Sequence, residues 1–287
     1  MQDLRSQFIE DLSRLESLPS LPAVVTRLVR LIDDPMASAM DVAYALREDP
    51  PLTARVLRMA NSPIYGGRFR ILSVPQAVMR LGMLEIRNLV LSLGVIRGML
   101  GAGRRLDYRA FWHHSLTVAL ASEALADAAP RGGEDDEGVF AAALLHDIGR
   151  FILDQFYPDA YDTAALLMAQ DHLPLAVAER RSLGVDHAEL GGLLADSWGL
   201  PEPIVAAIAH HHNPEMAVPS MQRLPLLIRV AEQTCVAHGL GDPLEGDIPS
   251  EPQSDWETLG LSEQDIKRVV SATMLSARKS AMLLSLA

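Results

Sequence analysis

The chain has 287 residues, of which 49% are hydrophobic, and it carries a formal net charge of −12 at pH 7. This apolar content is ample for a buried core and argues against a disordered scaffold. The negative charge argues against broad binding to nucleic acid or to an anionic membrane, because both attract Lys and Arg. The length allows one large domain or two packed ones, and we expect two lobes.

The N-terminal residues 1–12 contain carboxylates and polar groups where a secretory signal needs an apolar run. No stretch reaches the roughly 18 to 20 uninterrupted apolar residues of a membrane span. The single cysteine, Cys235, excludes an intramolecular disulfide and is typical of a reducing compartment. We therefore expect a soluble, cytoplasmic protein with no membrane association.

Apolar residues recur at helical spacing and hardly ever alternate, which predicts an all-α fold. In the first part of the chain, helices are expected at residues 21–32, 41–47, 52–60 and 84–100. Another helix follows Ser73-Val74-Pro75 and ends near Gly82, after a loop rich in glycine and arginine at 65–70. The run Gly101-Ala102-Gly103 marks a boundary, so residues 1–104 form the expected N-terminal helical lobe.

Residues 105–287 form the expected second lobe, with acidic loops at 130–136 and 239–254. Its helices are predicted at residues 107–128, 137–156, 158–171, 175–182, 187–198, 201–212, 221–238 and 262–286. The last helix has an apolar stripe that could serve the core or an interface, and core is the commoner fate. The oligomeric state stays open.

Potential metal ligands occur at five places in the second lobe, each on a different predicted helix. They are His113-His114, His146-Asp147, His187, His210-His211-His212 and Glu232. Imidazole and carboxylate groups together suit a divalent transition metal and leave room for a bound water. Whether these side chains converge is not decided by spacing alone.

His114 lies on the apolar stripe of Phe111 and Val118, so it is expected to face inward as a ligand or as a core histidine bonded to a carbonyl. The pair His146-Asp147 lies in an apolar run, where a buried carboxylate is costly without a cation or several donors. A metal ion or a neighbouring histidinium would satisfy Asp147. A nearby glycine would let another backbone or a ligand approach.

His187 follows the capping residue Asp186 and begins an inward-facing stripe. At least one of His211 and His212 should reach the interior, although histidines at a helix end can also simply interact with the helix dipole. Glu232 by itself would usually be a solvated glutamate, and only the other candidates make it a possible ligand.

The phrase Leu144-Leu-His-Asp-Ile-Gly-Arg150, downstream of Phe111-Trp-His-His-Ser115, resembles the HD superfamily of metal-dependent phosphohydrolases. The first lobe contains phrases similar to those of the HDOD family, the HD-related output domains: Leu18-Pro-Ser-Leu-Pro22, Asp49-Pro-Pro-Leu-Thr53, Arg58-Met-Ala-Asn-Ser62 and Ala77-Val-Met-Arg-Leu-Gly82. Together the phrases cover most of residues 15–240. The resemblance implies a multi-helix HD-like bundle preceded by a smaller helical lobe, and a bacterial signalling role.

The resemblance also implies a divalent metal, with Fe, Mn, Zn or Mg as candidates, held by residues that match the superfamily's metal positions. These are His114, His146, Asp147, His187, His211 and His212, with Glu232 at the late aspartate position. Glutamate there adds a methylene, which could preserve binding while spoiling water activation. Arg150 stands where HD enzymes often carry lysine, and no Gly-Tyr-Pro phrase follows His212, so cyclic-dinucleotide hydrolysis is not predicted.

Two functional hypotheses remain. The first is an output or scaffold module that acts in trans on signalling protein partners and keeps a structural or sensory metal, because no receiver, kinase or DNA-binding segment is recognisable. The second is a metal-dependent phosphohydrolase acting on a nucleotide or other phosphoester, in which Asp147 and Arg150 would be catalytic. A nucleic-acid contact through arginines of residues 47–70 and 97–109 is not expected, since a solvated basic face explains them.

Overall fold

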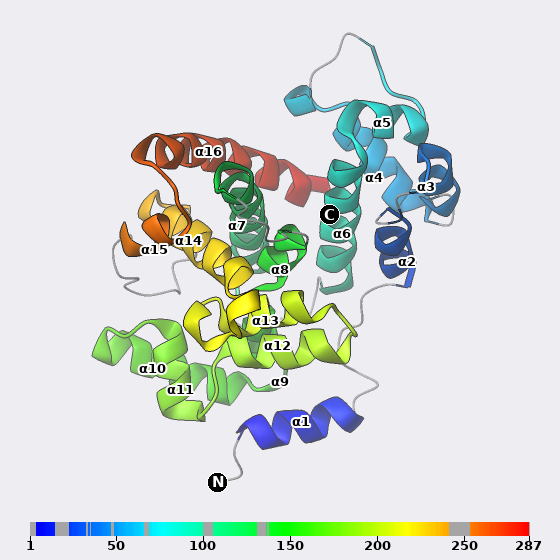
Figure 1. The fold of residues 1–287 in the computed structure, drawn as a ribbon. Helices are drawn as coiled ribbons and strands as arrows, with labels where there is room; N and C mark the ends of the chain where they lie inside the picture. The colour runs from blue at the N-terminus through cyan, green and yellow to red at the C-terminus, as the bar shows by residue number, and fades with distance from the viewer. Residues whose placement is uncertain are drawn as a thin grey trace. The chain divides into compact units, whose positions relative to one another are not determined.

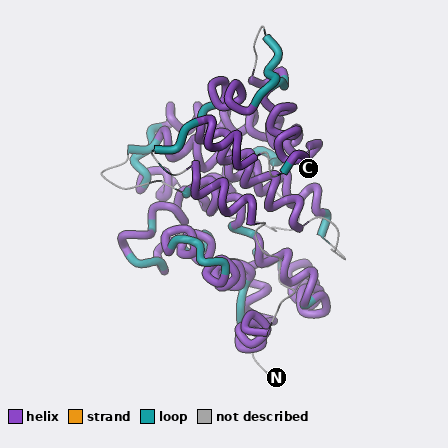
Figure 2. Tube along the Cα trace, turned by 90° about the vertical axis from the view of Figure 1, so that its right-hand side faces the viewer, coloured by secondary structure: helices purple, strands orange, loops and turns teal. Residues whose placement is uncertain are grey.

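The computed structural model describes residues 4–14, 23–32, 34, 36–46, 49–65, 69–99, 106–130, 136, 138–240 and 253–286. Within these ranges the regular structure is helical and contains no strand, which confirms the expected all-α fold (Figures 1 and 2). The phrase at 18–22, the expected lobe boundary at 101–104 and most of the expected loops at 130–136 and 239–254 lie outside the described residues.

The chain divides into two compact units. The larger unit comprises residues 1–18 and 102–278, and the smaller comprises residues 19–101 and 279–287. The sequence-based division instead assigned residues 1–104 to one lobe. The structure groups the N-terminal helix with the larger unit because α1 packs on α12, where Arg5 forms an ion pair with Glu189.

The smaller unit is built from five α-helices and one short 3₁₀ turn within the described residues. They are α2 (Ala23–Ile32), α3 (Ala39–Leu46), α4 (Pro50–Ala60), η1 (Pro63–Tyr65), α5 (Val74–Leu81) and α6 (Met83–Met99). Asp49 caps α4 by accepting the Leu52 backbone N–H at 3.0 Å, and Pro50 supplies the first helical residue. The core side chains Leu28, Leu46 and Met59 are fully buried.

The larger unit holds the candidate site. Its described helices are α1 (Leu4–Arg14), α7 (Tyr108–Ala128), α8 (Val139–Leu145), α9 (Ile148–Phe156), α10 (Pro158–Asp171), α11 (Leu175–Leu183), α12 (His187–Ser197), α13 (Glu202–His210), α14 (Arg223–Ala237), α15 (Gln253–Thr258) and α16 (Glu263–Leu286), with 3₁₀ turns η2 (Pro214–Met216) and η3 (Pro219–Met221). Helix α16 belongs to the larger unit only as far as residue 278. The long helix α7 is buried along most of its length and packs against α8 and α14.

The helices of the larger unit differ from the expectation at three places. Helices α1 and α15 were not expected, and the helix predicted for residues 137–156 is divided into α8 and α9 by a turn at His146 and Asp147. Neighbouring residues of one continuous helix do not face the same way. At this break both side chains reach one buried cluster.

Among the described helices, none combines the length and apolar character needed to cross a membrane.

Candidate metal centre

The turn between α8 and α9 is packed directly against the start of α12. Gly149 lies so close to His187 that a Cβ atom at this position would be 2.0 Å from the His187 carbonyl oxygen. Only a residue without a side chain fits such an approach. Gly149 thus brings the backbone of His187 next to the His146-Asp147 turn.

His187 is the first residue of α12, and its position is fixed by the helix start. The Asp186 side chain caps α12 by accepting the Glu189 backbone N–H at 2.9 Å. Arg180 on α11 donates to the same carboxylate at 2.7 Å. The capped helix presents the His187 ring to Asp147, with 3.1 Å between Nε2 and Oδ1.

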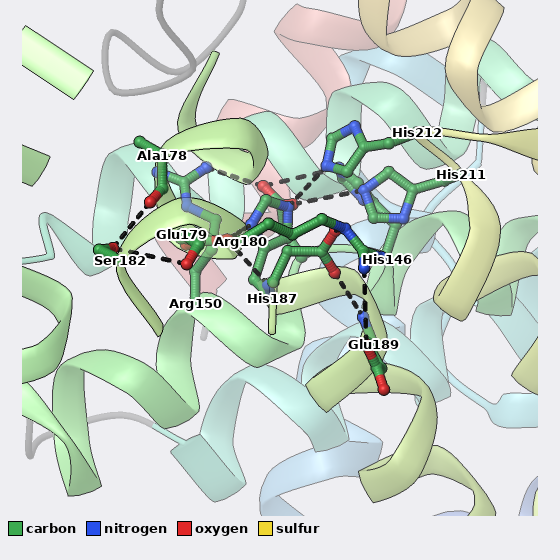
Figure 3. A network of polar contacts seen from close by, with 12 residues as sticks. His146, Arg150, Ala178, Glu179, Arg180, Ser182, His187, Glu189, His211 and His212 are labelled. Carbon is green, nitrogen blue, oxygen red and sulfur yellow. Dashed lines mark hydrogen bonds and ion pairs between the residues drawn. The ribbon is translucent and has the colours of Figure 1, made fainter. Parts of the chain in front are cut away.

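His211 and His212 follow the last residue of α13. His211 is fully buried, as the sequence predicted for at least one of this pair, and its ring centroid lies 5.1 Å from that of His146. The His212 Nε2 atom lies 2.8 Å from the His187 Nε2 atom. Figure 3 shows the rings of His211 and His212, which follow α13, close to that of His187, which begins α12.

The ligand atoms of these residues form two groups that share His211, each with all its atoms within 4.8 Å of one another. The first group is His146, Asp147, His211 and Glu232, and the second is His187, His211 and His212. Within the first group, His146 Nε2 lies 3.7 Å from Asp147 Oδ2 and 4.0 Å from Glu232 Oε1. Two ligands that bind one ion at about 2 Å lie about 3 to 4 Å apart. A buried His, Asp and Glu cluster that could hold a metal is therefore present.

The two remaining candidates, His114 and Arg150, lie outside both groups of ligand atoms. The His114 ring is buried, with its centroid 5.4 Å from that of His146, but it belongs to neither group of ligand atoms. Arg150 is also fully buried, and its Nη1 atom donates to Asp147 Oδ2 at 2.8 Å. Arg150 thus lies behind Asp147 as its ion-pair partner.

The ring nitrogens of His146 and His211 are oriented for metal binding. Their Nδ1 atoms lie 2.6 Å from Ala143 O and 2.8 Å from Ile208 O, so both Nδ1 atoms carry the proton. Their Nε2 atoms are buried without a hydrogen-bond partner among the described residues. Such buried acceptors are costly in the absence of a partner, and a cation would satisfy both.

Burial also holds these two rings in the neutral form that binds metals. It lowers the pKa of His146 from 6.5 to about 4, and burial with the nearby His146 lowers the pKa of His211 to about 3. Burial alone would raise the pKa of Asp147, but His146 and Arg150 hold it well below its ordinary value. The centre thus offers neutral imidazoles and an ionised carboxylate.

His187 differs in charge from its neighbour His212. Burial opposes protonation of His187, but Glu179 and Asp147 overcome this effect and raise its pKa well above 6.5. Burial and the nearby His211 lower the pKa of His212 well below 6.5. The Nε2 atoms of these two rings lie 2.8 Å apart, so a proton on one of them is shared with the other.

A cleft of about 480 Å³ leads to this cluster. Asp147, His187, His212 and Glu232 lie on its lining. Its apolar wall is residues 174–177, and the two arginines on the lining are Arg180 and Arg229. Each arginine pairs with carboxylates, Arg180 with Asp186 and Arg229 with Asp255. Small molecules can thus reach part of the centre from the cleft.

The burial of one carboxylate next to the centre, that of Glu179, was not predicted from the sequence. Glu179 on α11 is fully buried and lies 2.6 Å from the Nδ1 atom of His187. A glutamate eight residues before His187, on another helix, has no periodic relation to it. Only the apolar surroundings of Glu179 on α11 could have indicated that it is buried.

Comparison with known proteins assigns this architecture to a family. The family model of the HDOD domain matches residues 18–214, and the chain belongs to the HDOD family. An uncharacterized protein from Treponema pallidum (strain Nichols) is 26% identical over 275 residues, covering 92% of this chain. The chain spans 50% of the length of that relative.

Solved structures agree with the family. An HDOD domain protein of unknown function from Geobacter sulfurreducens superposes with a TM-score of 0.81 at 27% identity, covering 99% of this chain and 98% of its own. A candidate phosphohydrolase from Shewanella amazonensis SB2B superposes with a TM-score of 0.74 at 26% identity, with 98% of each chain covered. A candidate signal transduction protein from Marinobacter aquaeolei VT8 superposes with a TM-score of 0.77 at 25% identity, and the match covers 99% of this chain and 62% of that protein.

Proposed function

We propose that this chain is an output or scaffold module of bacterial signal transduction that acts through protein partners and holds a divalent metal in its larger unit. The family and the similarity to a candidate signal transduction protein support the signalling role. The observation that carries the metal is the burial of two Nε2 atoms, of His146 and His211, with no hydrogen-bond partner among the described residues.

The ligands proposed for the metal are His146, Asp147, His187, His211, His212 and Glu232, while His114 packs beside His146. When bound, a divalent ion would lower the pKa of a coordinated water and polarise a phosphoryl oxygen. Asp147 would stay ionised because Arg150 pairs with it. The Nδ1 contacts of His146 and His211 to backbone carbonyls would hold the rings in the binding orientation.

The second candidate function is hydrolysis of a phosphoester, and the cleft favours it because ligand residues of the cluster lie on its lining. The position of Arg150 argues against this function. Its guanidinium is buried against Asp147 and is not on the lining of the cleft, so it cannot offset the charge of a phosphate there. Arg180 and Arg229 are on the lining, but both already pair with carboxylates.

A hydrolysis screen separates these two functions. Metal-loaded protein would be incubated with phosphomonoesters, nucleotides and cyclic dinucleotides, and products would be separated by chromatography. As a scaffold, the wild type is expected to show no more turnover than the His146→Ala variant. Turnover that is lost in His146→Ala while the fold persists would replace the scaffold with the hydrolase.

A further inference from the structure

Glu179 and His187 form a buried pair that links α11 to the start of α12. The Oε2 atom of Glu179 accepts the His187 backbone N–H at 2.8 Å and lies 2.6 Å from the His187 Nδ1 atom. The carboxylate is fully buried, and His187 is 2% exposed. One oxygen atom thus holds both the backbone and the ring of the same residue. Figure 3 shows Glu179 beside His187.

Two contacts of one residue to one acceptor restrict the rotation of the ring. With Nδ1–H directed at Glu179, the Nε2 atom of His187 points to the centre, 3.1 Å from Asp147 Oδ1 and 2.8 Å from His212 Nε2. Histidines that bind metals commonly donate their second ring N–H to a carboxylate, which fixes the tautomer and makes the ring a better ligand.

A second residue of α11 also contacts the start of α12. Arg180, the next residue, forms an ion pair with Asp186, the residue that caps α12 and precedes His187. Behind His187, Gly149 packs against its carbonyl oxygen. The backbone of His187 is therefore held by its cap, by Gly149 and by Glu179, while only Glu179 among these also holds its ring.

We propose that Glu179 is a positioning residue of the metal centre, which acts on the metal through His187. The inference rests on the proposed metal site. A neutral glutamine could also accept the His187 backbone N–H, so this backbone contact alone gives no reason to bury a charged carboxylate at this position.

The test is a titration of chelator-stripped protein with Co²⁺, followed by its visible absorption and by competition for affinity. Glu179→Gln keeps the shape of the side chain and removes its charge. We expect it to weaken Co²⁺ binding by about 10- to 100-fold and to change the absorption spectrum. Glu179→Asp keeps the charge but withdraws the oxygen, and it is expected to weaken binding less.

A matched control is Asp154→Asn. Asp154 is another fully buried carboxylate of the larger unit, and it accepts a backbone N–H from Leu106 and the hydroxyl of Tyr108. It belongs to neither group of ligand atoms and is not on the lining of the cleft. Its substitution is expected to lower stability while leaving Co²⁺ affinity within about twofold.

A double-mutant cycle separates positioning from general damage. If Glu179 acts through His187, then Glu179→Gln should have no further effect on Co²⁺ affinity in a His187→Ala protein. An equal loss in that background, or wild-type affinity in both Glu179→Gln and Glu179→Asp, would overturn the inference and leave the metal site standing. A wild type that does not bind Co²⁺ would overturn the metal site itself, and this inference with it.

Discussion

Replacing Gly149 with alanine is expected to lower the free energy of unfolding by about 3 kcal/mol or more. The added Cβ would lie 2.0 Å from the carbonyl oxygen of His187 and 2.8 Å from its carbonyl carbon. These are backbone atoms at the capped start of a helix, so they cannot move aside as the end of a flexible side chain can. The loss would be measured by urea unfolding of the metal-free protein.

Gly191→Ala is the matched control for this substitution. Gly191 lies in the same helix as His187, and an added Cβ would meet the Cγ2 atom of Ile208 at 3.1 Å. A side-chain methyl can shift by a few tenths of an ångström, so the expected cost is about 1 kcal/mol or less. Similar losses in the two variants would contradict the tight contact between the α8–α9 turn and α12.

The metal-free protein is expected to lose stability on mild acidification. His146 and His211 have pKa values of about 4 and about 3 when folded and near 6.5 when unfolded. Between pH 6.5 and 4 the unfolded chain therefore binds more protons, and the free energy of unfolding falls as the pH falls. The difference for His146 alone amounts to about 3 kcal/mol by pH 4.

His187 acts in the opposite direction. Its pKa is raised well above 6.5 in the folded protein, so its contribution is fully present below pH 6.5 and is lost as the pH rises through the folded value. Stability of the metal-free protein should therefore peak near pH 6.5. Urea unfolding between pH 4.5 and 8.5 would measure this, and His146→Gln should flatten the acid side. A free energy of unfolding that stays constant from pH 6.5 to 4.5 would contradict buried neutral histidines.

The sequence predicted the helical class and an inward-facing His187, together with burial of at least one of His211 and His212, but it left open whether these residues converge. The break between α8 and α9 was not predictable from periodicity, since the turn interrupts an apolar run without proline. Glu232 shows the same limit, because a lone glutamate is usually solvated and this one is 3% exposed. Its burial follows from the packing of α14 against α7, α8 and α13, which spacing along the chain does not show.

The resemblance to a known family contributed what periodicity could not. It placed Glu232 among the ligands, and the structure brings this residue within 4.0 Å of His146, measured between Oε1 and Nε2. It also aligned Arg150 with the lysine of HD enzymes, and in the structure Arg150 is buried against Asp147. Glu179 came from neither source, because its partner lies on another helix and only the fold joins them.

The most direct test of the proposed centre is metal content per chain, measured by elemental mass spectrometry on protein purified without chelator. The wild type would be compared with a His146→Ala, His211→Ala double variant whose fold is checked by circular dichroism. The proposal predicts about one or two equivalents of Fe, Mn, Zn or Mg in the wild type and their loss in the variant. Substoichiometric metal in both proteins would contradict it.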